Sequence, residues 1–422
     1  MRKDKLINNI SWNLVFLYLI LVFIGWINIY SASKTDVHFE ILDFSSKYGK
    51  QLIWAVISIA AAVVIVFVDT RFFQNFSSIF YLISLLSLIG LFVFGKTING
   101  ATSWYSIGSS TLQPTEFTKI AVALGVAKLL GDKQFDLKLF NNQIKAFIIL
   151  IIPSILIILQ PDPGSALVYL SFFFVFYREG LPKHYIIISL TLLITALSVI
   201  KFGLITIEII NFILFIAFIY YIYKYKNHFL RKNIINYIGG FLGFAIFIFS
   251  IHFTFTKLPQ RHIDRISIAL NMIKDTKGKG YNLEQSKIAI GSGSVFGKGF
   301  LKGTQTKGDF VPEQHTDFIF STVGEEWGFV GSSFVILLFV IFILQIIHIA
   351  EKQKSKFSRV YGYSIASIFF FHFTINIGMV IGILPTIGIP LPFFSYGGSS
   401  LLAFTILLFI FIDLDANRGN EW

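Results

Sequence analysis

Long apolar segments separated by short polar connections follow one another through the whole chain. They lie near residues 12–31, 51–69, 76–95, 113–131, 146–160, 164–177, 185–201, 203–223, 234–255, 328–350, 360–384 and 398–413. A helix needs about 20 apolar residues to cross the hydrocarbon layer of a membrane. The pattern therefore predicts an all-α polytopic membrane protein with about twelve spanning helices, in a single integral membrane domain over residues 1–422.

Composition supports lipid as the solvent of this fold. Of the 422 residues, 55% are hydrophobic and only 14% are charged, and the mean hydropathy is +0.72. A soluble fold of this length could not bury so much apolar surface. The chain has no cysteine, so disulfides and thiol chemistry are excluded.

Basic residues predict the orientation of the chain in the membrane. The formal charge of +12 comes from short basic runs in alternate connections, as in 2–5, 133–138, 224–232 and 352–359. Cytoplasmic loops of membrane proteins carry this excess of Lys and Arg. We therefore expect both termini in the cytoplasm, membrane lipids as partners, and no nucleic-acid binding.

Three connections on the predicted outer side are unusual, at 96–112, 256–326 and 384–399. Long loops are where function concentrates in membrane and soluble folds alike. The long loop 256–326 contains Ile263, Ile266, Leu270 and Ile273 at helical spacing. Such a piece either lies along the membrane surface or caps the helix bundle.

Two groups of charged or polar residues interrupt the apolar pattern. Glu116 and Lys119 lie three residues apart on a helix that Pro114 opens, so they share one face and can pair. Gln160 to Gly164, with Asp162 at the centre, separates two short apolar stretches. Broken spans often mark sites inside membrane proteins. The alternative for Asp162 is an ordinary tight turn in contact with water.

Asp317 is the strongest candidate for chemistry, at the predicted outer boundary where a helix starts. It could instead cap that helix, because Asp suits an N-cap. A single carboxylate suits a transfer reaction whose leaving group is a diphosphate, since only the incoming hydroxyl then needs a base. Glu325 is two turns further along and does not form an acid–base pair with Asp317. His315 is the alternative base.

Two further segments could bind an anion. Glycines 291, 293, 297, 299, 303 and 308 alternate with Lys287, Lys298, Lys302 and Lys307. Residues 395–399, Ser-Tyr-Gly-Gly-Ser, open the last predicted helix on the same side. Backbone amides at such places can hold a diphosphate, although plain loops and helix starts have the same composition. Neither a P-loop nor a Gly-x-Ser-x-Gly elbow nor a His/Cys cluster occurs in the sequence.

The motifs at 99–101, 113–116, 160–162, 285–293, 312–320 and 390–398 resemble, in order, those of the SEDS family (shape, elongation, division and sporulation). Gly303-Thr304-Gln305 resembles the elongation branch of that family more than the division branch. The resemblance implies a membrane glycosyltransferase fold of the GT-C-like type. It also implies polymerisation of lipid II into β-1,4 glycan strands outside the inner membrane, with release of undecaprenyl diphosphate.

The same resemblance implies roles for individual residues. Asp317 takes the catalytic position, as base or as ligand of an assisting Mg or Mn ion, with no organic cofactor. Glu116, Lys119 and Asp162 line the central cavity. The remaining candidate substrate-binding or cavity residues are Gln285, Ser286, Lys287, His315, Thr316, Ser395, Gly397 and Gly398. The implied partners are a class B penicillin-binding protein, a transpeptidase, and membrane proteins of the elongation machinery.

The sequence departs from the family pattern in two places. Thr102 and Ser103 precede Trp104, where the family has an Arg directly before the Trp. The family usually has ten spans, so we predict an inserted helical hairpin at about 185–233. A hairpin keeps the orientation of everything that follows it, and the loop with Asp317 still faces out.

Two other functions remain open from the sequence. A lipid II flippase would also need broken helices and buried charges. It has less need of one carboxylate at the outer boundary, because it engages its substrate from both sides. A non-catalytic membrane scaffold would not account for the buried Glu116 and Lys119.

Overall fold

The computed structural model describes residues 9–33, 43–98, 100–108, 110–258, 260–270, 272 and 280–420. Asn99 and Ile273, and the basic residues before Asn9, lie outside the described residues. The chain divides into two compact units. The first comprises Met1–Leu181 and Asn282–Trp422, and the second comprises Pro182–Tyr281.

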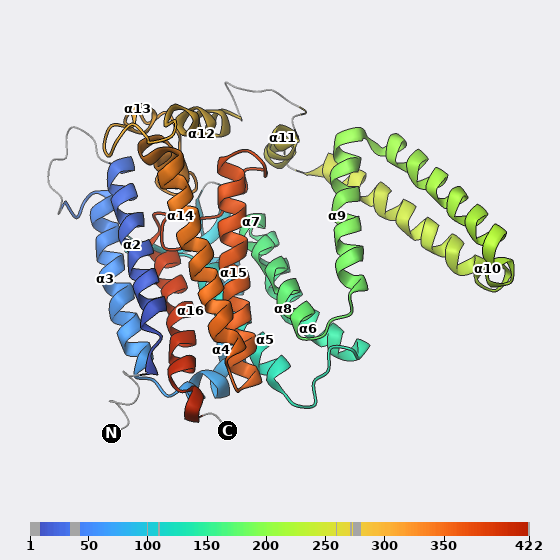
Figure 1. The fold of residues 1–422 in the computed structure, drawn as a ribbon, viewed down its shortest axis with the longest axis horizontal. Helices are drawn as coiled ribbons and strands as arrows, with labels where there is room; N and C mark the ends of the chain where they lie inside the picture. The colour runs from blue at the N-terminus through green and yellow to red at the C-terminus, as the bar shows by residue number, and fades with distance from the viewer. Residues whose placement is uncertain are drawn as a thin grey trace. The chain divides into compact units, whose positions relative to one another are not determined.

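The first unit is an upright helix bundle (Figure 1). Its long helices are α2 (Trp12–Ser33), α3 (Lys47–Val66), α4 (Thr70–Phe94), α5 (Pro114–Gly131), α6 (Phe140–Leu159), α14 (Ile319–Glu351), α15 (Lys356–Val380) and α16 (Gly398–Ala416). Its short elements are α7 (Pro163–Leu167), η1 (Val168–Ser171), α8 (Phe172–Arg178), α12 (Tyr281–Ser292), α13 (Thr304–Lys307) and η2 (Arg418–Asn420).

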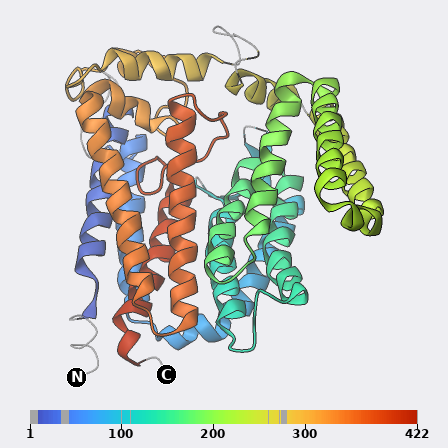
Figure 2. The same ribbon diagram turned by 45° about the vertical axis from the view of Figure 1, so that its right-hand side comes forward.

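The start of α2 and the end of α16 lie together at one end of this bundle, and α12 and α13 lie at the other (Figures 1 and 2). The Ser11 hydroxyl donates to Asp415 at 2.5 Å, which joins the two terminal helices directly. The first and last described residues of the chain therefore lie at the same end of the bundle, as the prediction of both termini on one side requires.

Helices occupy all twelve predicted positions. Among the described residues, ten helical segments are long and apolar enough to cross a membrane. The other two predicted spans are α5, which carries Glu116, Lys119 and Lys128, and the stretch 163–178, which is divided into α7, η1 and α8. The departures from a plain apolar span therefore occur in the segments that carry or adjoin the candidate polar residues.

The second unit contains α9 (His184–Phe202), α10 (Leu204–Lys257) and α11 (Gln260–Ala269). The ring centroids of Phe215 and Phe241 are 4.4 Å apart. In a straight helix residues so separated in sequence would be about 39 Å apart, so α10 turns back on itself. It supplies two candidate spans, 204–224 and 234–257, beside α9. The unit thus extends beyond the hairpin predicted at 185–233.

A small antiparallel sheet, which the all-α prediction missed, forms the connection between α4 and α5. Its strands are β1 (Lys96–Ile98), β2 (Ala101–Ile107) and β3 (Ser110–Leu112), in the order β1-β2-β3. The backbone N–H of Thr102 donates to the Gln160 carbonyl at 3.1 Å, and the Tyr105 hydroxyl donates to the Ser87 carbonyl at 2.7 Å. The strands β1 and β3 have only three residues each, too few for an alternating pattern to be recognised in a sequence.

The core of the first unit lies along α15 and α16. The buried share of the candidate span is 83% for α16 and 61% for α15, against 6% for each span of the second unit. Phe369 of α15 and Phe404 and Phe411 of α16 are completely buried. The candidate site is therefore built next to deeply buried helices of the first unit.

Helix α14 is broken at Gly328, whose φ of 65° and ψ of −160° lie outside the helical region. Residues 294–299 dock against the break. The N–H groups of Phe329 and Val330 donate to the carbonyls of Ser294 and Val295, at 2.9 and 3.0 Å. Broken helices are tolerated at membrane depth only when their freed backbone groups find such partners. The docked loop holds the first turns of α14, directly after Asp317.

We predict that Gly328→Ala strongly destabilises the protein. An added Cβ would lie 2.2 Å from the backbone nitrogen of Gly297, and the backbone conformation is one that only glycine adopts readily. The expected loss is about 3 kcal/mol, seen as a lower melting temperature in detergent. Gly291→Ala on α12, where a Cβ meets nothing within 4 Å, is the control and should melt like the native protein.

Candidate active site

Two loops from distant parts of the sequence meet beside the start of α14. One contains residues 311–318 and the other contains residues 384–397. The Ser395 hydroxyl donates to the carbonyl of Thr316 at 2.7 Å, and the Tyr396 N–H donates to the carbonyl of His315 at 2.8 Å. The structure thus places Ser395 beside the segment His315–Asp317. The sequence had indicated these two places as separate candidates.

Two buried amide side chains hold these loops on the helix bundle. Gln51 of α3 donates to the Ser395 carbonyl at 3.5 Å and accepts from the Gly397 N–H at 3.1 Å. Asn376 of α15 donates to the carbonyls of Asp317 and Ile389, at 2.9 and 2.8 Å. An amide can donate and accept at once, which suits it to bridge backbone groups.

Asp317 is half-buried in the turn before α14. The helix begins at Ile319 with Phe318 at its N-cap, and no side chain caps it. The alternative that Asp317 serves as the N-cap is therefore wrong. The carboxylate lies against Gly388, where an added Cβ would be 3.1 Å from Oδ2. A Cβ there would be tight against the carboxylate, and the φ of +85° at Gly388 is one that glycine adopts most readily.

His315 lies between two charged side chains. Its Nδ1 is 3.3 Å from the Lys47 ammonium, and its Nε2 is 3.8 Å from the Glu313 carboxylate. Burial, with the positive charge of Lys47, lowers the pKa of His315 to about 4. The neutral ring accepts at Nδ1 from Lys47, because an ammonium can only donate. With that lone pair occupied, His315 is the weaker of the two candidate bases.

Glu325 is completely buried and fully hydrogen-bonded. Its carboxylate accepts from Lys298 at 2.7 Å, and from the backbone N–H groups of Gln305 and Thr306, each at 2.8 Å. This arrangement fixes the segment 298–306 and leaves the carboxylate no role in proton transfer at Asp317. It agrees with the interpretation that the two acids are not a catalytic pair. Lys298, a candidate anion ligand, is thereby engaged by Glu325.

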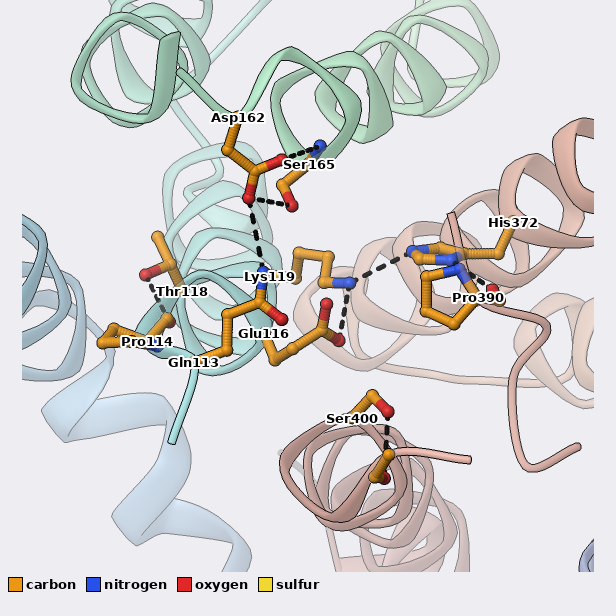
Figure 3. A network of polar contacts seen from close by, with 11 residues as sticks. Gln113, Pro114, Glu116, Thr118, Lys119, Asp162, Ser165, His372, Pro390 and Ser400 are labelled. Carbon is orange, nitrogen blue, oxygen red and sulfur yellow. Dashed lines mark hydrogen bonds and ion pairs between the residues drawn. The ribbon is translucent and has the colours of Figure 1, made fainter. Parts of the chain in front are cut away.

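The predicted ion pair on α5 is confirmed (Figure 3). The Lys119 ammonium lies 2.8 Å from the Glu116 carboxylate, and both side chains are almost completely buried. The same ammonium is 3.1 Å from Nε2 of His372, and it lies 4.7 Å from the ring centre of Phe404. Nδ1 of His372 is 3.0 Å from the carbonyl of Pro390, so the network reaches the second loop.

Asp162 has a local role in the broken segment after α6. It is the N-cap of α7, and accepts from the N–H and the hydroxyl of Ser165, at 3.1 and 2.8 Å. Gln113, next to the start of α5, donates to it at 3.3 Å (Figure 3). Asp162 therefore ties the break at 160–163 to the helix that carries Glu116 and Lys119.

The remaining candidates lie around the two loops. On α12, Ser286 donates to the Val380 carbonyl at 2.9 Å, and Lys287 lies 3.5 Å from Glu284 and packs over Gly382. Gln285 precedes them on the same helix. Gly397 is the N-cap of α16, and Gly398 leaves room for the ring of Trp54. These two glycines therefore serve packing and loop geometry.

Sequence reasoning missed Gln51, Lys47, His372 and Asn376. A signal for two of them was present, because His372 and Asn376 are polar residues one turn apart in the apolar segment 360–384. Polar residues in a spanning helix usually face the bundle interior and have a function. Within the described residues no group of three or more His, Asp or Glu side chains is placed to hold a metal ion.

These features define a polytopic membrane protein with a polar site at one end of its bundle. Its sequence matches the FtsW/RodA/SpoVE family of cell cycle proteins over residues 11–219 and 208–420, and the chain belongs to that family.

Curated relatives and solved structures agree with this assignment. The peptidoglycan glycosyltransferase RodA of Treponema pallidum is 32% identical, covering 98% of this chain and 99% of that protein. The peptidoglycan glycosyltransferase MrdB of Escherichia coli K12 is also 32% identical, over 89% and 85%. Two solved structures share the fold over 98% of this chain. One is a chain of a peptidoglycan synthase complex (99% of that chain, TM-score 0.69, 23% identity), and the other is Thermus thermophilus RodA (98%, 0.62, 22%).

We predict that acid weakens the fold through His315. Its pKa of about 4 lies below the value of about 6.5 in an unfolded chain, so the unfolded state binds the proton more readily. Stability should therefore fall as the pH drops from about 6.5 to 4, by about 3 kcal/mol at most. Melting temperatures across this range test the prediction. His315→Gln should show a smaller decrease, and an identical decrease in both proteins would contradict it.

Proposed function

We infer that this protein is a peptidoglycan glycosyltransferase that polymerises lipid II on the outer face of the cytoplasmic membrane. The observation that carries the inference is Asp317, held against Gly388 where two hydrogen-bonded loops meet beside α14. The names of the curated relatives support the reaction class, and they give no support to a flippase or a scaffold.

One carboxylate is sufficient for this reaction. The 4-hydroxyl of one lipid II unit attacks the anomeric carbon of the lipid-linked strand and loses its proton to Asp317. The new β-1,4 C–O bond forms as the anomeric C–O bond to the diphosphate breaks. The undecaprenyl diphosphate leaves as an anion, so no general acid is required. The elongation branch of the family implies that these strands serve growth of the cell cylinder.

An apolar cavity of about 370 Å³ supports a lipid-linked substrate. It lies between α4, α5 and α16, and Phe80, Phe117, Ala121 and Ile410 are among its lining residues. Positions 117 and 121 are on one side of α5, and 116 and 119 face the polar network. The helix thus separates an apolar compartment, which suits a polyprenyl tail, from a polar one, which suits a head group.

The orientation follows from the basic residues near the end with both termini. Lys356 donates to the carbonyl of Phe135 at 3.4 Å, and Gln353 donates to Asp415 at 2.8 Å, so these connections lie together. Their neighbours include Lys133, Lys138, Lys352 and Lys354. By the positive-inside rule this end is cytoplasmic, and Asp317 faces the periplasm from the inner membrane.

We propose a class B penicillin-binding protein as the partner, with other membrane proteins of the elongation machinery. The support is the similarity to a chain of a solved synthase complex in which polymerisation and crosslinking are coordinated. The transpeptidase would crosslink the strands that this chain makes.

A Mg or Mn ion fits the site only if the substrate supplies some of the ligands of the ion. Asp317 supplies a single carboxylate, and Mg²⁺ commonly binds one or two carboxylates together with substrate phosphates. Bound there, the ion would neutralise charge on the departing diphosphate. Asp317 would hold it in that case, while Lys47 and His315 stay engaged with each other.

Substitution of Asp317 tests its proposed role as the base. Purified protein with its cognate penicillin-binding protein should polymerise lipid II, and Asp317→Ala should reduce the rate by at least about 100-fold, because general base catalysis is lost. Gel analysis of the glycan strands measures this. Glu351→Gln removes an exposed carboxylate at the far end of α14 and should leave the rate unchanged. Equal polymerisation by Asp317→Ala and the native protein would remove the catalytic assignment.

A larger side chain in the apolar cavity tests whether the cavity binds the lipid tail. Ala121→Leu narrows it and should raise KM for lipid II several-fold, with little change in kcat, because the site for the tail is lost and the reacting groups are unchanged. Ala60→Leu, on the exposed side of α3, is the matched control. An unchanged KM for Ala121→Leu would exclude the cavity as the tail site.

Removal of divalent ions tests whether Asp317 acts as a metal ligand. Treatment with EDTA should abolish polymerisation by the native complex, and added Mg²⁺ or Mn²⁺ should restore it, if Asp317 acts as a metal ligand. The melting temperature should stay constant, since the ion is shared with the substrate. Full activity in EDTA would assign Asp317 as the base alone.

A further inference from the structure

His372 connects the buried ion pair of α5 to the loop beside Asp317. It lies on α15 with only 1% of its surface exposed. Its Nε2 is 3.1 Å from the Lys119 ammonium, and its Nδ1 is 3.0 Å from the carbonyl of Pro390 (Figure 3). The reaction proposed above has no step for this residue, although a buried histidine in a spanning helix is costly.

The two contacts determine the tautomer of His372. Lys119 can only donate, so Nε2 must accept and carries no proton. The carbonyl of Pro390 can only accept, so Nδ1 must carry the proton and donate. The ring is therefore a neutral connector with one acceptor and one donor. The Phe404 ring packs nearly perpendicular to it in a T-shaped contact, with ring centroids 4.9 Å apart, and helps to keep the imidazole in this orientation.

Three successive residues of the second loop are held at this place. Gly388 lies against the Asp317 carboxylate, Ile389 accepts from Asn376, and Pro390 accepts from His372. Asn376 also donates to the backbone carbonyl of Asp317. Pro390 has no N–H, so its carbonyl is its one backbone group available for a hydrogen bond. Without His372, residue 390 loses this hydrogen bond to the bundle.

We propose that His372 is a positioning residue for Asp317: it holds residues 388–390 through the Pro390 carbonyl and couples them to the Glu116–Lys119 pair. The proposal rests on the proposed function, because Asp317 matters only as the reacting group. A displacement of about 1 Å at a reacting group can cost about 100-fold in rate, so the hydrogen bond to Pro390 has catalytic consequences. The alternative role of His372 is only to accept a hydrogen bond from the Lys119 ammonium inside the membrane.

Two substitutions separate these roles, because each preserves one of the two contacts. In His372→Asn, the amide nitrogen takes the place of Nδ1 and still donates to Pro390. In His372→Gln, the amide oxygen takes the place of Nε2 and still accepts from Lys119. His372→Phe keeps a ring beside Phe404 and loses both contacts. Ser364→Ala is the control, since its buried hydroxyl donates only within α15, to the carbonyl of Val360.

Two measurements are made on the full-length protein with its partner. Hydrogen exchange of residues 384–397 reports the loop position without any need for activity. Lipid II polymerisation gives kcat and KM. In His372→Phe and His372→Gln we expect faster exchange and a kcat lower by about 10- to 100-fold, with KM unchanged. His372→Asn should remain within about threefold of the native kcat and keep native exchange.

The opposite pattern would overturn the proposal. If His372→Gln retains native exchange and kcat while His372→Asn does not, the residue serves Lys119 alone. Native exchange in His372→Phe would likewise remove the role in holding the loop. If the native complex makes no glycan strands, the proposed function fails, and the exchange measurement still decides whether His372 holds residues 388–390. If a variant has a lower melting temperature, its hydrogen exchange and its kcat are compared with those of Ser364→Ala at the same temperature.

Discussion

Within a membrane every buried polar group must find its partner inside the protein, and this constraint shapes the whole site. Hydrocarbon offers no hydrogen bonds, so an unpaired charge or amide is strongly unfavourable there. Glu116 and Lys119 neutralise each other, and Nε2 of His372 accepts a further hydrogen bond from the ammonium. Because the pairing requires α5, α15 and the second loop together, the polar network also defines how these elements pack.

Irregular backbone follows the same constraint. The break of α14 at Gly328 is tolerated because residues 294–299 supply its hydrogen bonds, and the loop at 384–397 is held by Gln51, Asn376 and Ser395. The second of these segments also contains Gly388, which lies against the Asp317 carboxylate. The surrounding helices thus hold the non-helical backbone of the candidate site in place.

Helix α5 combines the two kinds of environment that a lipid-linked sugar requires. One side of the helix lines the apolar cavity, and the other carries the buried ion pair. A substrate with a polyprenyl tail and a charged head group could thus contact both sides of the helix. This division explains why α5 is less apolar than a plain spanning helix, and why its two buried charges, Glu116 and Lys119, pair with each other.

The sequence by itself determined the membrane class, the positions of the helices and the Glu116–Lys119 pair, and it indicated Asp317 as the candidate for chemistry. These are local properties: apolar length, helical spacing, and a carboxylate at the start of a span. The small sheet at 96–112, the turn within α10 and the hydrogen bonds of Gln51, His372 and Asn376 were decided by the tertiary structure. The hydrogen bonds of these three side chains join groups far apart in the sequence, such as Gln51 with Ser395, and the spacing of residues along the chain does not indicate which distant groups meet.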